Sequence, residues 1–268
     1  AGSNDAELIG GGFTSAALSI TGADSANAVL DGRTLGLLGT GSLRMTSAVD
    51  DLAFTLTGGA DTAALADAAG AGLNQLTGAG LMDVVFPTPA VTLTLDTAGG
   101  GDVVTVSALD SAFGADVSID LGAGADSAEL VAVTGGGTWS VGGGVGLDGL
   151  TGPSANLTWS VSGMGAGSVS GGASFGFDGM ELLTGAGGED TFTFGASGSL
   201  AGAIDGGAGS DTLDLSAVTD PTTIDLEAGS ATRTGGIAGF ESFVANGADA
   251  TLIGASNVNA WTVTGSGV

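Results

Sequence analysis

The chain contains no Lys, His, Cys or Tyr. Its 268 residues include three cationic side chains, all of them arginines: Arg33, Arg44 and Arg233. The absence of His removes the imidazole base and the usual zinc or haem ligand. The absence of Cys removes thiolate nucleophiles, iron–sulfur clusters and disulfides. Any catalysis would therefore have to rest on carboxylates and hydroxyls.

The charge of the chain is almost entirely of one sign. Twenty-nine acidic residues give a formal net charge of −26. Nucleic acids and anionic membranes both attract proteins through a basic face, so neither is an expected partner. Any charged partner should be cationic, and metal ions come first.

Long apolar runs are missing as well. Gly, Asp, Ser or Thr interrupts every stretch before it reaches the ~18 apolar residues of a membrane span, so we expect no membrane insertion. Yet 43% apolar residues and a mean hydropathy of +0.45 are too hydrophobic for a disordered acidic tail. The chain should therefore fold. It opens on Ala1-Gly2-Ser3 without Met or a basic leader, as expected of a processed product or a piece of a larger protein.

Glycine is what the chain has in abundance. Fifty-four Gly residues without a Gly-X-Y repeat exclude collagen and indicate turns. Between the turns, polar and apolar residues alternate as in strands with one buried face. Such strands are predicted at Phe54–Leu56, Val91–Leu95, Val117–Leu121, Thr191–Phe194, Thr212–Leu215 and Thr223–Leu226, and around Trp139, Trp159 and Trp261. Because each Trp occupies an alternating apolar slot, we expect burial instead of sugar stacking. The Ala-rich segment Thr62–Leu73 predicts a short helix.

Gly-rich turns that end in Asp separate the strands. They end at Asp61, Asp102, Asp126, Asp190 and Asp211, and the separations of 41, 24, 64 and 21 residues lie near multiples of 20. Units of about 20 residues with short strands and Gly turns are typical of the coils of a β-solenoid. We therefore predict an all-β fold, a parallel β-solenoid of the β-helix or β-roll kind, with roughly 13 coils of about 20 residues.

The prolines provide the best candidate for an internal boundary. Pro87-Thr88-Pro89 suits a protruding loop or a sheet edge, because proline cannot donate to a ladder of hydrogen bonds. Residues 1–86 would then form N-terminal coils of more irregular sequence, and residues 87–268 would continue the solenoid with the clearer Gly-Asp turns. We expect both parts to belong to one continuous domain.

One turn resembles a known repeat. The segment Gly206 to Asp214 (GGAGSDTLD) fits the nonapeptide G-G-x-G-x-D-x-U-x of calcium-binding RTX proteins, and Gly185 to Thr193 (GAGGEDTFT) departs from it at the second position. The resemblance implies Ca²⁺ bound by Asp side chains and turn carbonyls. The candidate metal-site residues are Gly207, Gly209, Asp211, Gly188, Asp190, Asp126 and Asp102. The alternative is that each Asp merely closes its turn by accepting a backbone N–H.

The sequence pattern of residues 170–268 is similar to that of large repetitive exported bacterial proteins, namely surface-layer proteins and adhesins. That resemblance implies an extracellular location at the bacterial cell surface. We expect a calcium-stabilised structural protein that assembles with copies of itself as a homo-oligomer or polymer in a surface layer, filament or matrix, with cell-surface polysaccharide as a further partner. We expect no enzymatic activity and no catalytic residue.

Two other functions stay open. One is a calcium-dependent adhesin module that binds a glycan or host ligand. The other is a polysaccharide-active β-helix enzyme, since glycoside hydrolysis requires only two carboxylates at a defined separation. The adjacent acids Asp50-Asp51 and Glu189-Asp190 are candidates, although adjacent acids are common in a chain with 29 of them.

Overall fold

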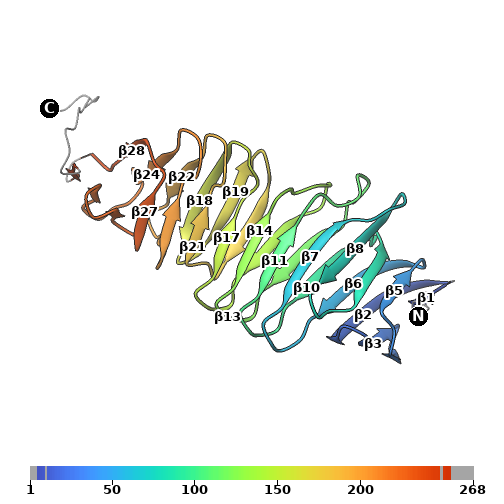
Figure 1. Ribbon diagram of the computed structural model, residues 1–268. Coiled ribbons are helices and arrows are strands. Elements are labelled where there is room, and N and C mark those ends of the chain that lie inside the picture. Colours follow the sequence, from blue (N-terminus) through green and yellow to red (C-terminus); the bar gives the residue numbers. More distant parts are fainter. Residues whose placement is uncertain (1–4, 10, 248–249, 255–268) are drawn as a thin grey trace.

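The computed structural model describes residues 5–9, 11–247 and 250–254. In this part of the chain every regular element is a β-strand, so the all-β prediction is confirmed. No helix there is long and apolar enough to cross a membrane. The strands form an elongated stack with β1 at one end and β28 at the other (Figure 1).

One wall of the stack is an eleven-stranded sheet, called sheet A. Its order is β1 (Asp5–Leu8), β5 (Ser42–Met45), β9 (Asp83–Pro87), β8 (Leu73–Gly78), β7 (Thr62–Asp67), β11 (Val103–Val106), β14 (Ser127–Leu130), β17 (Gly149–Thr151), β21 (Leu182–Thr184), β23 (Ala203–Asp205) and β27 (Gly236–Ala238). All neighbours pair in parallel except those of β8.

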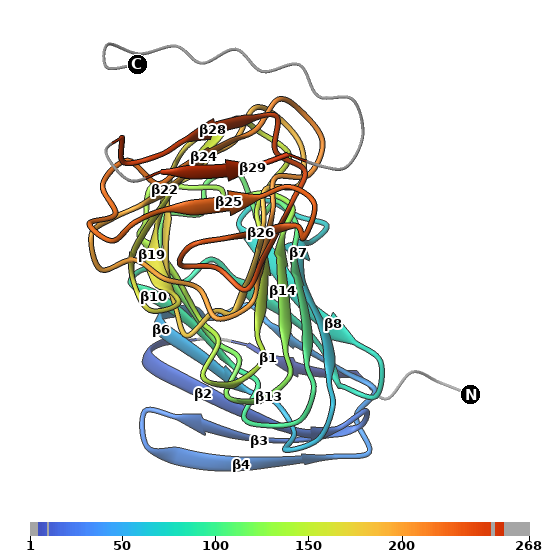
Figure 2. The same cartoon turned by 90° about the vertical axis from the view of Figure 1, so that its left-hand side faces the viewer.

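The opposite wall is a thirteen-stranded sheet, called sheet B. Its order is β28 (Ser242–Val244), β24 (Thr212–Asp214), β22 (Thr191–Phe194), β18 (Leu157–Gly163), β19 (Ala166–Gly171), β20 (Phe175–Asp178), β15 (Trp139–Gly142), β12 (Asp116–Asp120), β10 (Thr92–Asp96), β6 (Ala48–Thr55), β2 (Gly12–Gly22), β3 (Ser25–Leu30) and β4 (Arg33–Leu38). Strands β3 and β19 are antiparallel to their neighbours. Figure 2 shows β10 and β19 on one side of the stack and β7 and β14 on the other.

Two small sheets complete the described structure. One joins β13 (Ala123–Gly124) to β16 (Val145–Gly146), and the other joins β25 (Thr223–Asp225) to β26 (Ser230–Ala231) and β29 (Thr251–Ile253). We call one passage of the chain through both large sheets a rung. Parallel sheets stacked in rungs are compatible with the predicted solenoid.

The core lies between the sheets and follows from the alternation in the sequence. Each strand turns its apolar residues inward, so equivalent positions stack from rung to rung: Trp159 pairs with Phe192, which pairs with Leu213. The rings of Trp159 and Phe192 are stacked, with centroids 5.2 Å apart and an angle of 10° between their planes. Trp139 and Trp159 are 4% and 0% exposed, which confirms their predicted burial. Trp261 lies outside the described residues.

The predicted helix at Thr62–Leu73 is wrong. Residues Thr62–Asp67 form β7, and Leu73 begins β8. Strand β7 pairs in parallel with β11, and it buries Ala63 and Leu65 on one face. The helix propensity of Ala is worth only tenths of a kcal/mol per residue, so tertiary pairing and burial outweigh it.

Hairpins inserted into the rungs make the number of rungs smaller than predicted. The meanders β2–β3–β4, β7–β8–β9 and β18–β19–β20 each add an antiparallel strand to a sheet. Sheet A consequently has ten strands that run the same way, fewer than the roughly 13 passages expected from a constant 20-residue unit. Pro87 is the last residue of β9, the final strand of the meander β7–β8–β9.

Candidate functional site

The Gly-Asp turns converge on two rows of carboxylates that run along the stack. The first row, ladder A, precedes the strands of sheet A and contains Asp61, Asp102, Asp126, Asp148 and Glu181. The backbone N–H of each member donates to the carboxylate of the next, at N···O distances of 2.7, 2.6, 3.0 and 2.9 Å. Every carboxylate after Asp61 thus binds the rung on its N-terminal side, whereas the carboxylate of Asp61 accepts from the N–H and hydroxyl of Thr57 in its own turn.

The second row, ladder B, precedes the strands of sheet B. The N–H of Leu157 donates to Asp190 at 2.8 Å, the N–H of Asp190 to Asp211 at 2.7 Å, and the N–H of Asp211 to Glu241 at 2.8 Å. Both ladders end on a Glu within the described residues. The aspartates inside the two ladders are buried. Asp102, Asp148, Asp190 and Asp211 are at most 1% exposed, and Asp126 is 4% exposed.

Glycine is required in these turns because the backbones of adjacent rungs nearly touch. A Cβ built on Gly209 would lie 1.6 Å from the carbonyl oxygen of Gly188, and one on Gly207 would lie 2.4 Å from that of Ala186. Gly188, Gly207 and Gly209 also have φ of 120°, 94° and 151°, in the region where only glycine is free of strain. These three residues therefore allow the close stacking that brings Asp190 next to Asp211.

Each central aspartate uses one carboxylate oxygen and leaves the other without a hydrogen bond. The buried Oδ2 atoms of Asp102, Asp126, Asp148, Asp190 and Asp211 have no hydrogen-bond donor among the residues that the structure describes. A buried oxygen without a partner costs about 1–3 kcal/mol, and more if it is charged. Five of them on stacked rungs, with strands ~4.8 Å apart, favour a cation, a proton or water at these atoms.

The structure brings the predicted site residues together in two places. Asp102 and Asp126 are consecutive in ladder A, and Asp190 and Asp211 are consecutive in ladder B, beside Gly188, Gly207 and Gly209. The two ladders are separate, because one precedes each sheet. The alternative, an Asp that closes its own turn by accepting a backbone N–H, holds for Asp61, which accepts from Thr57. At Asp102, Asp126, Asp190 and Asp211 the accepted N–H belongs to another rung.

The sequence interpretation missed four ladder members as site residues: Asp61, Asp148, Glu181 and Glu241. A signal for the two glutamates exists, because Gly179-Met180-Glu181 and Gly239-Phe240-Glu241 repeat each other at a distance of 60 residues. Asp148 follows Gly146-Leu147 directly before β17, as Asp126 follows Gly124-Ala125 directly before β14. Position before a strand is therefore the shared signal, more than the nonapeptide.

Burial raises the proton affinity of one aspartate in each ladder, Asp148 and Asp190. Desolvation, with a smaller contribution from the charge of Asp211, raises the pKa of Asp190 to about 6, against the backbone hydrogen bond from Leu157 that lowers it. Desolvation also raises the pKa of Asp148, and the charges of Asp126 and Glu181 act in the same direction. The exposed Asp116 contrasts with both, because hydrogen bonds from Thr138 lower its pKa.

We expect Asp190 to make the metal-free protein less stable as the pH rises through about 6. Its folded-state pKa lies above the ordinary 3.8, so the folded state holds the proton more tightly, and this contribution is complete below about pH 4 and lost above 6. Asp190→Asn, which mimics the protonated form, should equal the wild type at pH 4 and exceed it at pH 7 by at most about 3 kcal/mol. Urea denaturation of protein freed of metal beforehand on a chelating resin measures the difference, and a difference that does not change with pH would contradict the expectation.

The ladders offer hard oxygen donors, which are the ligands that Ca²⁺ prefers. Within the described residues no three His, Cys, Asp or Glu side chains gather closely enough to hold a metal by themselves. A cation at Oδ2 of a ladder aspartate would therefore need turn carbonyls or water as its remaining ligands. The buried, unpartnered oxygens fit such an ion in chemistry and charge.

A second feature is the outer face of sheet B. One row of outward positions crosses eight strands through paired residues: Thr94, Ser118, Ser140, Gly176, Ser168, Ser160, Thr193 and Asp214. The adjoining row contains Asp96, Asp120, Gly142 and Asp178. Shallow depressions of about 320 and 380 Å³ lie on this face, where glycines leave room between hydroxyls.

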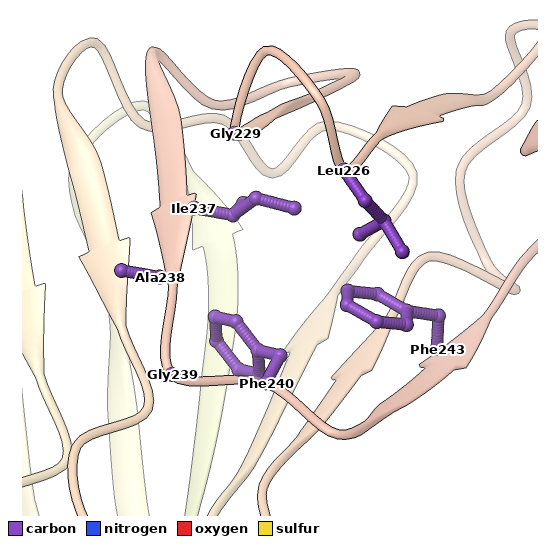
Figure 3. Close-up of a pocket in the computed structure, with 7 residues that line it drawn as sticks. All are labelled: Leu226, Gly229, Ile237, Ala238, Gly239, Phe240 and Phe243. Atoms are coloured by element: carbon purple, nitrogen blue, oxygen red, sulfur yellow. The ribbon is translucent and has the colours of Figure 1, made fainter. Parts of the chain in front are cut away.

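A third feature is an apolar pocket near the C-terminal end of the stack. It has a volume of about 160 Å³ and is lined by Leu226, Gly229, Ile237, Ala238, Gly239, Phe240 and Phe243 (Figure 3). Phe240 meets Phe192 of the core edge-on, with ring centres 5.6 Å apart. None of the lining residues is ionisable, so the pocket offers apolar contact without acid–base chemistry.

No protein-family model, curated protein or solved structure matches the chain.

Proposed function

We propose that the protein is an extracellular structural protein of the bacterial cell surface, a parallel β-solenoid that assembles with its own copies in a surface layer, filament or matrix. The observation that carries the proposal is the elongated stack of parallel strands with two carboxylate ladders along it. The RTX-like turn, and the resemblance of residues 170–268 to bacterial surface proteins, support the extracellular location. Enzymatic activity is not part of the proposal.

Calcium stabilises the solenoid in this proposal. Asp190 and Asp211 of ladder B, with carbonyls of the turns that contain Gly188, Gly207 and Gly209, would hold one ion, and Asp102 and Asp126 of ladder A another. The bound ion supplies positive charge to carboxylates that are buried and stacked. Its support is the set of five unpartnered Oδ2 atoms in a chain of net charge −26.

Calcium should raise the melting temperature, and Asp211→Asn should reduce the gain. At a free concentration a hundredfold above Kd, an ion that binds the folded state alone adds about 2.7 kcal/mol, or roughly 5–10 °C for a chain of this size. Asn keeps the acceptor for the N–H of Asp190 but removes the anionic oxygen. Thermal melts with Ca²⁺ and with EGTA measure both effects.

The exposed Asp24 provides a control with the same change of charge. Asp24→Asn should leave the calcium gain unaltered, because the carboxylate lies outside both ladders. Identical wild-type melts with Ca²⁺ and with EGTA, together with no calcium in elemental analysis, would reject the calcium part of the proposal and leave the ladders as a purely structural device.

A calcium-dependent adhesin module is the second candidate, and the outer face of sheet B favours it. Its rows of Ser, Thr and Asp offer regularly spaced donors and acceptors to the hydroxyls of a polysaccharide such as one on the cell surface. Glycan-array binding by a chain that stays monomeric in calcium and physiological salt would reverse the order of the two candidates.

A further inference from the structure

The two ends of the stack differ from its sides in having strand edges. In the described residues, β1 and β4 are the last strands of sheets A and B at the N-terminal end, and β27 and β28 are the last at the C-terminal end. A strand edge presents backbone N–H and C=O groups that can pair with another chain. The sides present turns, which lack such rows.

Strand direction is the same at both ends. In sheet B, β3 and β19 are antiparallel to both of their neighbours, so the strands on either side of each are parallel to one another. As a result, β4 and β28 both run parallel to β2, β6 and β24. In sheet A, β8 is likewise antiparallel to both neighbours, so β1 and β27 also run parallel to each other. A second copy placed end to end could therefore continue sheet B in parallel, from β28 to β4. Sheet A does not continue in the same way, because β3 and β4 project two strands beyond β1 and the N–H of Ile237 on β27 already donates to the carbonyl oxygen of Gly229.

Exposed apolar side chains gather at the two ends. Of the thirteen large hydrophobic residues that are exposed, seven lie within the first 38 residues or beyond residue 240: Ile9, Val29, Leu35, Leu38, Val244, Leu252 and Ile253. Leu38 at the end of β4 is 84% exposed. The apolar pocket between Phe240 and Phe243 adds to this surface at the C-terminal end (Figure 3).

The two ends also differ in charge. The outermost hairpin of the N-terminal end, β3–β4 (residues 25–38), contains Arg33 and the single acid Asp31, for a formal charge of 0. The segment from β23 to β29, residues 203–253, contains eight acids and Arg233, for a charge of −7. Arg233 is already paired with Asp220. Like ends would bring acid to acid at the C-terminal end, whereas unlike ends bring arginine to acid.

We infer that the N-terminal end of one copy docks on the C-terminal end of the next, with β4 beside β28. This inference rests on the proposed self-assembly and specifies its interface. The contact is heterologous, so it does not close on itself and generates a filament in which sheet B continues from copy to copy. Arg33, on β4, lies against the acidic end of the neighbour.

Two charge insertions test the interface. Leu38→Asp places a charge on β4, whereas Met164→Asp makes the same change at an equally exposed apolar residue, 82% exposed, away from both ends. Leu38→Asp should raise the critical concentration for filaments by about tenfold or more, because the unpaired charge is buried on docking. Met164→Asp should leave it unchanged. The reverse pattern in sedimentation and electron microscopy would overturn the inference in favour of a lateral contact.

The orientation can be read by cross-linking, because the chain has no native Cys. We expect a short bismaleimide to join Leu38→Cys chains to Val244→Cys chains in a mixture, and neither variant to itself. Cross-linked Leu38→Cys alone would show that like ends meet and would overturn the inference. Filaments without any end-to-end cross-link would reject the interface but keep the proposed function, whereas a wild-type chain that never assembles would reject both.

Discussion

Gly124→Ala should prevent the native stack from forming. A Cβ on Gly124 would lie 1.4 Å from the carbonyl oxygen of Gly100 on the preceding rung, and 2.8 Å from Oδ1 of Asp126. The nearest atom belongs to the backbone, so no change of rotamer relieves the overlap. These two rungs must separate, which would break the bridge between Gly99 and Ala123 and weaken ladder A. We expect a loss of more than about 4 kcal/mol, beyond the usual range for point mutants.

Gly58→Ala is the matched control. Gly58 belongs to the same kind of Gly-Asp turn, but nothing lies within 4 Å of its Cβ position and its φ is not in the left-handed region. The substitution should be neutral or should stabilise by up to about 1 kcal/mol, because Ala lowers the entropy of the unfolded chain. Circular dichroism during urea titration compares the two variants. A Gly124→Ala protein that unfolds like the wild type would show that the rungs are not in close contact.

Trp159→Ala should cost about 3–5 kcal/mol, the range for removing a large aromatic side chain from a core. Trp159 is fully buried and contacts the rings of Phe175, Phe177 and Phe192 at centroid distances of 5.8, 5.9 and 5.2 Å. It lies where β18 and β22 meet, so the cavity would separate two rungs. Chemical denaturation followed by circular dichroism measures the loss.

Trp159→Phe separates the packing of the ring from its polar atom. The indole Nε1 is buried without a hydrogen-bond partner, so Phe removes an unsatisfied donor while it keeps most of the aromatic contact. We expect a loss below about 1.5 kcal/mol. Equal losses for the Ala and Phe variants would mean that the stacked aromatic column contributes little.

Strands were predictable from the sequence where the alternation was strong. Thr191–Phe194 coincides with β22, and the predicted strands at Thr212–Leu215 and Thr223–Leu226 match β24 and β25 to within one residue. These short segments alternate polar and apolar residues, so burial and local pattern agree. At Thr62–Leu73 the local composition favours a helix, and only the pairing with β11 makes it a strand. That partner is 41 residues away and is invisible to a local pattern.

The candidate site was predictable in its residues but not in its connections. The Gly-Asp turns identified Asp102, Asp126, Asp190 and Asp211, and these carboxylates do stack in pairs. The sequence could not show that each accepts an N–H from another rung, because the separations of 21 to 41 residues vary with inserted hairpins. Ladder membership depends on lying before a strand in the correct register, and register is a property of the folded sheets.

The alignment of the sheets with the long axis has a mechanical consequence. The hydrogen bonds between rungs run along the stack, so all rung boundaries carry tension between the β1 end and the β28 end in series (Figure 1). The weakest boundary separates first, and the next one resists in its turn. Successive members of ladder A are 41, 24, 22 and 33 residues apart. At ~3.4 Å per extended residue, each freed rung releases about 75–140 Å of chain. Under load, the protein would lengthen in steps, and each step would dissipate mechanical work.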